Sequence, residues 1–326
     1  MNGIVLIGSN GMLGHDLKLK LSEWQRDGVC QLDCPSSFDL DISNGRTVAN
    51  YLMDCRNRGY DTVINCAAMT DVYRIETDDV SKLVSYRVNA LGPKYLAETC
   101  SRLHMGLVHF STDYVYSQYS TWGGMSNDEF PVNSYGQHKL FGELFIKEAM
   151  RTNYTIFRIG CLYGIHREKS FIHKFLRNLC RSYIRGERQI RVGSYQESTP
   201  TSTNFVCGNV IPVLLNNTLG GTVTLSPGGS ASRYEFANEL AAIMKFRNVL
   251  GKLSEVEILP DDSEVKYLPS FSVMNALNGT SHLGASLETW QKQLDCFVKV
   301  NLPSLKDFIE KIMNEESQKT ERESGS

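Results

Sequence analysis

The chain has 326 residues, 41% of them hydrophobic, and its 34 lysines and arginines nearly balance 36 aspartates and glutamates. This length supplies a large core and exceeds that of most single compact units, so we expect two lobes. The balanced charge gives no field that would draw the chain to nucleic acid or to a membrane surface, and we expect neither as a partner.

The cysteines and the two ends of the chain carry information about its location. Nine cysteines, an odd number without paired Cys-x-x-Cys units, are typical of buried thiols in a reducing cytosol. The apolar run Ile4–Ile7 is too short for a signal or membrane-spanning segment, so we expect a cytoplasmic protein. The sequence leaves open whether two copies form a homodimer. The polar, charged residues 315–326 predict a disordered tail.

Short β-rich apolar runs alternate with helical patterns through the first half of the chain. The predicted strands are Ile4–Ile7, Val29–Asp33, Thr62–Asn65, Leu107–Phe110 and Thr155–Phe157. The predicted helices are Met12–Trp24, Gly45–Arg56, Leu83–Cys100 and Tyr135–Met150, with Ser43 and Ser134 as N-caps. This rhythm predicts an α/β fold over residues 1–164, a doubly wound parallel sheet of the Rossmann type that binds a dinucleotide.

The rhythm changes after Gly164. A basic helical stretch over Phe171–Arg185 precedes a loop that contains Pro200, a short β-like run at Thr222–Leu225, and a helix over Arg233–Met244. We interpret residues 165–314 mainly as a smaller substrate-binding lobe that acts as a lid, with segments that return to the first domain.

Glycines follow the first predicted strand at a spacing of three and lead into a helix. Such a loop lets the backbone turn tightly and approach a pyrophosphate, whose charge then lies at the helix N-terminus. The alternative is a tight turn without a ligand, since glycines cluster in many turns. The position between a strand and a helix favours a dinucleotide, bound by Gly8, Asn10, Gly11, Met12, Leu13 and Gly14.

Asp33 ends the second predicted strand, about twenty residues after the loop, where an acidic side chain can accept hydrogen bonds from the adenosine ribose. Its charge would repel a 2′-phosphate and so favours NAD(H) over NADP(H), although neighbouring loop residues can compensate. Asp41 and Ile42 are candidates for flanking the adenine, and a surface turn is an equal explanation for Asp41.

Tyr135 and Lys139 lie four residues apart, so their side chains leave the same face of a predicted helix. A phenol ordinarily has a pKa near 10, and a nearby cation favours its ionised form. The pair alone is also typical of a solvated helix face. Its place after Ser111 and Thr112, hydroxyls at the carboxyl end of a central strand, favours proton chemistry at a bound ligand.

These residues together resemble the extended short-chain dehydrogenase/reductases, and within them the dTDP-4-dehydrorhamnose reductases of dTDP-rhamnose biosynthesis. The resemblance covers roughly residues 1–300. It is carried by Gly8-x-x-Gly11-x-x-Gly14, Asn65-Cys66-Ala67-Ala68 with Thr70, Asn89, Ser111-Thr112-Asp113-Tyr114-Val115-Tyr116, Tyr135-Gly-x-x-Lys139, Arg158, Tyr163-Gly164, Gln196 and Pro200-Thr201.

The resemblance implies an oxidoreductase that uses NAD(H) or NADP(H) to reduce the C4 ketone of a nucleotide-linked 6-deoxy-4-keto sugar. It implies that Tyr135 donates the proton, that Lys139 lowers its pKa and holds the nicotinamide ribose, and that Thr112 hydrogen-bonds the carbonyl oxygen. Ala67, Ala68 and Thr70 would line the cofactor passage, and the sugar would meet Asp113, Tyr114, Cys161 and Pro200.

The chain also departs from this pattern. Cys161 stands where the reductases have an aromatic residue, and Tyr73 stands where they have an aspartate. These changes leave two other functions open. One is a non-catalytic regulatory subunit, like that of methionine adenosyltransferase. The other is a nucleotide-sugar epimerase or dehydratase, for which an acidic residue such as Asp113 is typical.

The seven histidines are scattered, without His-x-x-x-His or Cys/His spacing that suits a metal ion. We therefore expect no metal site.

Overall fold

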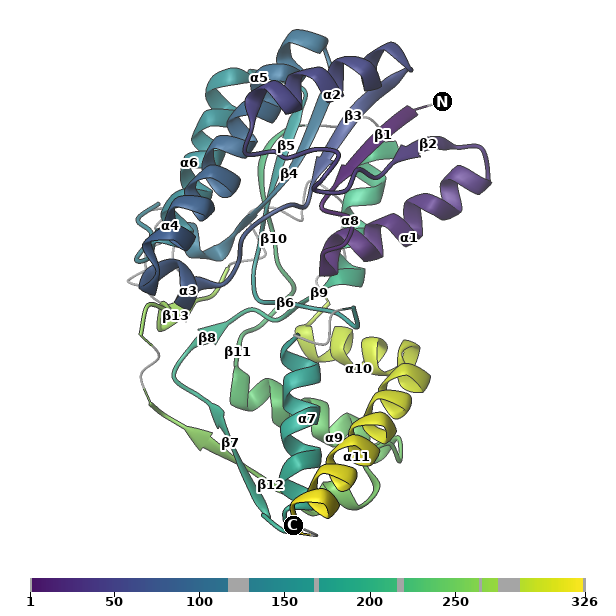
Figure 1. The fold of residues 1–326 in the computed structure, drawn as a ribbon, viewed down its shortest axis with the longest axis vertical. Coiled ribbons are helices and arrows are strands. Elements are labelled where there is room, and N and C mark those ends of the chain that lie inside the picture. Colours follow the sequence, from purple (N-terminus) through teal and green to yellow (C-terminus); the bar gives the residue numbers. More distant parts are fainter. Residues whose placement is uncertain are drawn as a thin grey trace.

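The computed structural model describes residues 2–116, 129–166, 170–215, 220–263, 266–274 and 288–324. The chain folds into two lobes that meet at a waist, with the N-terminus in the larger lobe and the C-terminus in the smaller (Figure 1). A six-stranded parallel sheet of order β2-β1-β3-β4-β5-β10 forms the centre of the larger lobe and confirms the predicted Rossmann-type α/β fold. Its strands are β1 (Asn2–Ile7), β2 (Cys30–Asp33), β3 (Tyr60–Asn65), β4 (Gly106–Thr112), β5 (Tyr154–Ile159) and β10 (Gly221–Leu225).

Helices cover both faces of this sheet because its strands alternate buried apolar side chains between two cores. In β1, Ile4 and Leu6 pack with α1 (Met12–Arg26) and α8 (Thr203–Leu215) on one face. Val5 and Ile7 belong to the core on the opposite face. That core is covered by α2 (Gly45–Asn57), α5 (Gly92–Leu103) and α6 (Ser134–Ala149).

Two predicted N-caps are each wrong by one residue. The N-caps of α2 and α6 are Asn44 and Asn133, not Ser43 and Ser134. The Asn44 side chain accepts hydrogen bonds from the backbone N–H groups of Arg46 and Thr47, and Asn133 accepts one from Gly136. Each asparagine thereby satisfies donors that the first helical turn leaves unpaired.

The helix predicted over Leu83–Cys100 is interrupted. It consists of the end of α4 (Asp79–Tyr86), a π-helical turn over Arg87–Leu91 and most of α5, and a short α3 (Val72–Thr77) precedes it. Within the π turn, the buried Asn89 amide bonds to both backbone groups of Met69. This amide ties the segment after β3 to the helical layer, at the edge where the candidate site lies.

The smaller lobe is a helical core with short strands at the waist. Its helices are α7 (Phe171–Ile184), α9 (Arg233–Phe246), α10 (Trp290–Val300) and α11 (Leu302–Ser324). At its outer end β7 (Gln189–Gly193) pairs in parallel with β12 (Glu257–Asp261). The waist holds β6 (Leu162–Tyr163), β8 (Glu197–Ser198), β9 (Thr201–Ser202), β11 (Ala231–Ser232) and β13 (Phe271–Ser272).

Two expectations for the second half are corrected. The run Thr222–Leu225 is not part of a lid, because β10 extends the central sheet beside β5. The end of the chain is helical, since α11 continues through residue 315 to Ser324 and leaves only residues 325 and 326 outside the described part. The Glu316 carboxylate lies 2.8 Å from Arg181 of α7, and Ile312 is fully buried, so both charge and packing hold this helix.

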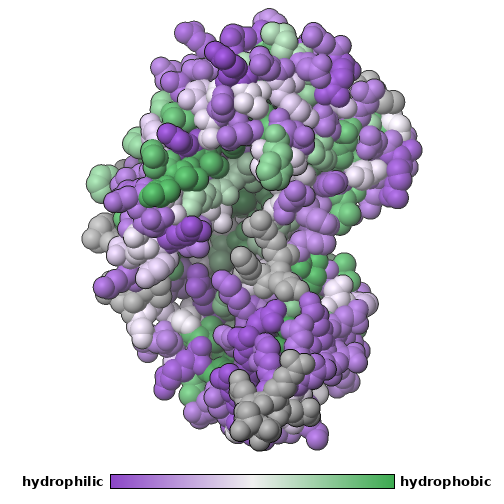
Figure 2. All heavy atoms as spheres, viewed as in Figure 1, coloured by the Kyte–Doolittle hydropathy of each residue, from purple (hydrophilic) through white to green (hydrophobic). Residues whose placement is uncertain are grey.

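The surface supports the two-lobe description. In this view hydrophilic residues cover most of both lobes, and hydrophobic residues show on one side of the larger lobe and in the hollow between the lobes (Figure 2). Among the described residues no helix combines the length and the hydrophobicity needed to cross a membrane. All nine cysteines are free thiols.

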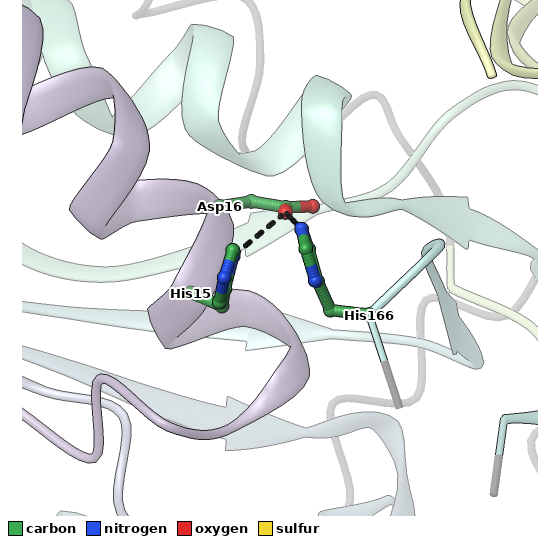
Figure 3. A group of neighbouring side chains, drawn as sticks. All are labelled: His15, Asp16 and His166. Atoms are coloured by element: carbon green, nitrogen blue, oxygen red, sulfur yellow. Dashed lines mark ion pairs between the residues drawn. The ribbon is translucent and has the colours of Figure 1, made fainter. Parts of the chain in front are cut away.

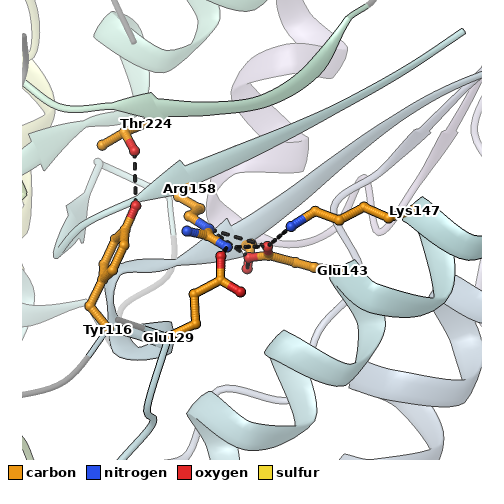
Figure 4. Close-up of polar contacts among 7 residues, drawn as sticks. Tyr116, Glu129, Glu143, Lys147, Arg158 and Thr224 are labelled. Carbon is orange, nitrogen blue, oxygen red and sulfur yellow. Dashed lines mark hydrogen bonds and ion pairs between the residues drawn. The ribbon is translucent and has the colours of Figure 1, made fainter. Parts of the chain in front are cut away.

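A buried ionic cluster joins α6 to the sheet (Figure 4). Glu143 of α6 is fully buried, and its carboxylate accepts hydrogen bonds from Arg158 of β5 at 3.0 Å and from the Ser111 hydroxyl of β4 at 2.5 Å. Glu129 bonds to the same guanidinium, and Lys147 lies 3.4 Å from Glu143. Arg158 therefore braces the end of the sheet, and removing one partner would leave a charge buried without compensation.

We predict that Arg158→Met lowers the free energy of unfolding by about 3 kcal/mol, because Glu143 loses its buried counter-charge. The double variant Arg158→Met, Glu143→Leu should regain most of that loss, since no buried charge remains. Urea unfolding of the three proteins measures both effects. Equal stability of wild type and Arg158→Met would show that the cluster does not hold α6 to the sheet.

Candidate functional site

The glycine loop lies at the point where the strand order of the sheet reverses, between β1 and β3. Gly8 has φ 77°, and a Cβ atom there would lie 2.6 Å from the Ala67 backbone nitrogen. A Cβ on Gly14 would lie 2.2 Å from the Gly8 carbonyl oxygen. Both positions therefore require glycine, and the loop stays close to the sheet edge.

The first turn of α1 is open to an anion. Its N-cap, Gly11, supplies no side-chain hydrogen bond, and the turn contains no acidic residue. The backbone N–H groups of this turn thus remain available at the switch point of the sheet, where open α/β folds bind ligands. The loop fits the pyrophosphate of a dinucleotide.

The other predicted cofactor residues differ in what they expose. Asn10, Ala68 and Thr70 present exposed side chains, and Gly11, Met12 and Ala67 are partly buried. Leu13 packs in the core, so only its backbone can face a ligand. Ile42 is also a core residue, packed against α5 at Gly92. The exposed Asp41 accepts a hydrogen bond from the Ser43 backbone N–H at 2.9 Å, as a turn carboxylate does.

Asp33 lies at the end of β2 and contacts α2 and the residue that follows it. Its Oδ2 accepts hydrogen bonds from the Tyr51 hydroxyl at 3.0 Å and from Arg58 at 3.2 Å. The Cys55 thiol lies 3.6 Å from the same oxygen. These contacts all use Oδ2, so Oδ1 keeps its lone pairs for a further donor.

Thr112, Asp113 and Tyr135 come together beyond the carboxyl end of β4. The Thr112 hydroxyl donates to Asp113 Oδ1 at 2.8 Å. Burial, together with the Asp113 charge, raises the pKa of Tyr135 above its ordinary value, and a hydrogen bond with Thr112 opposes that rise. The phenol is therefore protonated at neutral pH and poised as a proton donor.

Lys139 lies one helical turn after Tyr135 and is 2% exposed. Its Nζ is 3.2 Å from His109 Nε2 and donates a hydrogen bond to the Phe110 carbonyl oxygen, so it faces β4. Burial lowers the pKa of Lys139 to about 8, against the opposing charge of Glu143. The structure thus brings Thr112 and Tyr135 together and places Lys139 behind them.

A second group of side chains lies on the waist side of Thr112 and Tyr135. Tyr114 packs edge-on against Tyr135, with ring centroids 5.9 Å apart, and its hydroxyl accepts a hydrogen bond from Gln196 at 2.7 Å. The charge of Arg233, the first residue of α9, acts on both Tyr114 and Cys161. The predicted Pro200 is buried in the loop before β9. Residues from both lobes therefore meet beside the Thr112 and Tyr135 hydroxyls.

Several residues of this region were not singled out from the sequence. Arg233 follows Ser232, whose capping box with Glu235 is a recognisable helix start, so its place at the first helical position could have been found. His109 and Glu143 had no such signal, because a strand histidine and a helix glutamate are common and their partners lie on other elements.

One histidine group also escaped the spacing argument (Figure 3). Ligand atoms of His15, Asp16 and His166 lie within 4.8 Å of one another. The two imidazole rings stack with centroids 3.3 Å apart at an angle of 31°. Imidazoles bound to one metal ion fan out from it, so this geometry favours a histidine pair that shares a carboxylate. The absence of a metal site stays a prediction.

The Asp113 carboxyl makes the free energy of unfolding depend on pH. Burial raises the pKa of Asp113 to about 6, although the hydrogen bond from Thr112 opposes the rise. Because the folded pKa lies above the unfolded value, the full stability is present below about pH 4 and is lost as the pH rises through 6. At pH 8 the ionised carboxylate costs the folded state on the order of 2–3 kcal/mol.

We predict that Asp113→Asn raises the free energy of unfolding by about 2 kcal/mol at pH 8 and changes it little at pH 4. Urea unfolding at the two pH values measures the difference. The matched control is Asp307→Asn, at an exposed position of α11, which should have no effect at either pH. A gain of equal size at both pH values would contradict the assigned burial of the charge.

Comparison with known proteins agrees with this architecture. The family model described as the RmlD substrate binding domain matches residues 1–302. A dTDP-4-dehydrorhamnose reductase of Mycolicibacterium smegmatis is 30% identical over 236 residues, which cover 72% of this chain and 67% of that protein. A probable dTDP-4,6-dihydroxy-2-methyloxan-3-one 4-ketoreductase of Streptomyces antibioticus is 31% identical, over 74% of this chain and 76% of that protein.

A solved structure gives the same result in three dimensions. The dTDP-4-dehydrorhamnose reductase of Bacillus anthracis, in complex with NADP, superimposes with a TM-score of 0.76 at 27% identity and covers 92% of this chain and 99% of that one. The family model, the relatives and the fold agree with the resemblance carried by the glycine loop and the Tyr135 helix. The chain belongs to the RmlD substrate binding domain family.

Proposed function

We propose that the protein is a reductase that uses a nicotinamide dinucleotide to reduce the C4 ketone of a nucleotide-linked 6-deoxy-4-keto sugar. The observation that carries this proposal is the meeting of Thr112 and Tyr135 at the carboxyl end of β4, beside the glycine loop, with buried Lys139 behind them. Relatives of similar length named as sugar ketoreductases support the substrate class.

Reduction of a ketone places negative charge on its oxygen, and hydroxyl groups aimed at that oxygen stabilise the charge as it forms. A bound reduced nicotinamide supplies the hydride. Tyr135 then gives its phenol proton to the oxygen, because burial has kept it protonated. Thr112 turns its hydroxyl from Asp113 to the same oxygen. Lys139, as an ammonium, stabilises the phenolate that remains.

The residues on the waist side suit the rest of the substrate. We assign Asp113, Tyr114, Cys161 and Pro200 to the sugar side of the site, as the resemblance implies. Arg233 adds a positive charge from the smaller lobe, which suits the diphosphate of a sugar nucleotide. A substrate that bridges both lobes would exclude water from Thr112 and Tyr135. The nine free thiols favour a reducing compartment, the cytoplasm.

We predict that Tyr135→Phe lowers kcat for a 4-keto sugar nucleotide at least about 100-fold, because the proton donor is lost. The assay follows oxidation of NADH or NADPH with a panel of dTDP-linked 4-keto-6-deoxy sugars. Tyr154→Phe, at the start of β5 and at the far edge of the sheet, is the matched control and should keep full activity.

Two outcomes of this assay would contradict the proposed reductase activity. Tight dinucleotide binding without turnover on any sugar would favour a regulatory subunit. Conversion of the sugar without net oxidation of the cofactor would favour an epimerase or a dehydratase.

For the cofactor, we propose that Asp33 contributes a preference for NADH that Arg58 reduces. Oδ1 of Asp33 can accept hydrogen bonds from the ribose hydroxyls, and its charge repels a 2′-phosphate. The Arg58 guanidinium, 3.2 Å from Oδ2, offsets part of this repulsion and offers a cation to the same phosphate. The bound NADP of the Bacillus anthracis protein is consistent with room for that phosphate in the fold.

We predict that removing Asp33 and removing Arg58 change the ratio of NADPH affinity to NADH affinity in opposite directions. Asp33→Ala should raise the affinity for NADPH relative to NADH about tenfold, and Arg58→Ala should lower the same ratio. Fluorescence titration of wild type and both variants with each cofactor gives the six dissociation constants. An unchanged ratio in Asp33→Ala would show that this carboxylate does not face the adenosine ribose.

A further inference from the structure

A line of buried polar groups crosses the sheet directly behind the candidate active site. Asn65 at the end of β3, His109 on β4 and Lys139 on α6 are each no more than 2% exposed. Asn65 Nδ2 is 3.1 Å from His109 Nδ1, and His109 Nε2 is 3.2 Å from Lys139 Nζ. Because these groups are shielded from water, each proton on the line must have an acceptor.

The direction of the hydrogen bonds is fixed at one end of the line. The Ala67 backbone N–H, which can only donate, is 3.1 Å from Asn65 Oδ1. The amide group of Asn65 must therefore present its NH₂ side to His109 Nδ1. That ring nitrogen accepts, so it carries no proton.

A neutral imidazole has one N–H, which must then lie on Nε2. Burial lowers the pKa of His109 well below its ordinary value, so the ring is neutral. Its Nε2–H points at Lys139 Nζ. An ammonium has only donors and cannot accept this hydrogen bond, whereas an uncharged amine has the lone pair that can. The amine still donates to the Phe110 carbonyl oxygen.

We propose that His109 is a positioning residue whose Nε2–H favours the uncharged amine form of Lys139. The catalytic use of Lys139 as a cation rests on the proposed function. Protonation of Lys139 then requires the His109 proton to move to Nδ1 or the line to break at Asn65. The three side chains thus form a unit in which the charge of Lys139 and the tautomer of His109 change together.

The surrounding charges agree with this assignment. Glu143 is the neighbour whose charge favours the ammonium, and it already bonds to Arg158 and Ser111. Burial raises the pKa of Cys66, which therefore stays a neutral thiol. Other ionisable groups on elements packed against α6 face other partners. Glu76 of α3 bonds to Ser134, Lys82 of α4 acts on His138, Lys94 of α5 lies over Phe145, and Asp113 acts on Tyr135.

The direct test is NMR of the full-length protein without cofactor, labelled with ¹⁵N-histidine and ¹³C-lysine. The ring nitrogen shifts of His109 distinguish the Nε2–H tautomer, which we expect, from the Nδ1–H tautomer. The Lys139 side-chain carbon, assigned by its loss in Lys139→Arg, should titrate well below the ordinary lysine value of about 10.4. An Nδ1–H tautomer, or a lysine midpoint near 10, would overturn the proposal without any substitution.

Two variants separate the tautomer from simple burial. His109→Gln offers Lys139 a carbonyl acceptor in place of a donor, so its midpoint should rise by about one pH unit or more. Asn65→Asp replaces the amide donor by an acceptor of the same shape, so the His109 proton should move to Nδ1 and the Lys139 midpoint should rise. His104→Asn, at an exposed position, is the control and should change neither reading.

The added charge of Asn65→Asp has its own effect on Lys139. The same substitution in a His109→Phe background measures that charge alone, and an equal rise there would contradict the relay through the ring. None of these measurements needs substrate or turnover. A failure of the reductase assay and a failure of this proposal are therefore distinguishable.

Discussion

The candidate site depends on the buried bond between Glu143 and its partners on the sheet. The carboxylate lies one turn after Lys139 on α6 and bonds to Arg158 of β5 and Ser111 of β4. Two strands thus fix both the rotation and the position of one helix along its axis. Because Tyr135 and Lys139 lie on the same helix, this anchor also fixes where they meet Thr112 and the β4 backbone. A charged cluster would be a poor choice for stability alone, and here it sets the geometry of the proton donor.

Burial then sets the chemistry of the residues so placed. The same low-polarity surroundings raise the pKa of Tyr135 and of Asp113 and lower that of Lys139. The phenol is thus kept protonated, and the ammonium form of Lys139 is disfavoured relative to that of an exposed lysine. Asp113 ionises within this dry region at a cost to folding. Such a cost is expected where a charge serves a ligand and not the fold.

Much of the fold could be predicted from the sequence because its signals are local. The apolar runs of β1 to β5, the glycine loop and the spacing of Tyr135 and Lys139 are all readable within a few residues. The family resemblance added the role of Thr112, which spacing alone does not give. The N-caps were misplaced because serine and asparagine occur side by side at both helix starts, and either can cap.

What the sequence did not reveal depends on contacts between distant segments. The place of β10 beside β5, the burial of Glu316 against α7 and the stacking of His15 on His166 all join residues far apart in the chain. The line from Asn65 through His109 to Lys139 crosses two strands and a helix, so no spacing rule would find it. Hydrogen-bond direction, which follows from one backbone N–H, is visible only once the fold places these groups together.

The central claim is that Tyr135 donates a proton to the ketone oxygen, while the dinucleotide transfers a hydride to the carbonyl carbon. The most direct measurement is mass spectrometry and NMR of the product sugar after turnover with cofactor that carries deuterium at the transferable position of nicotinamide C4. We expect one deuterium on the carbinol carbon of the product, and none there when unlabelled cofactor is used in D₂O. Deuterium from D₂O on that carbon, or no transfer from the labelled cofactor, would contradict the account.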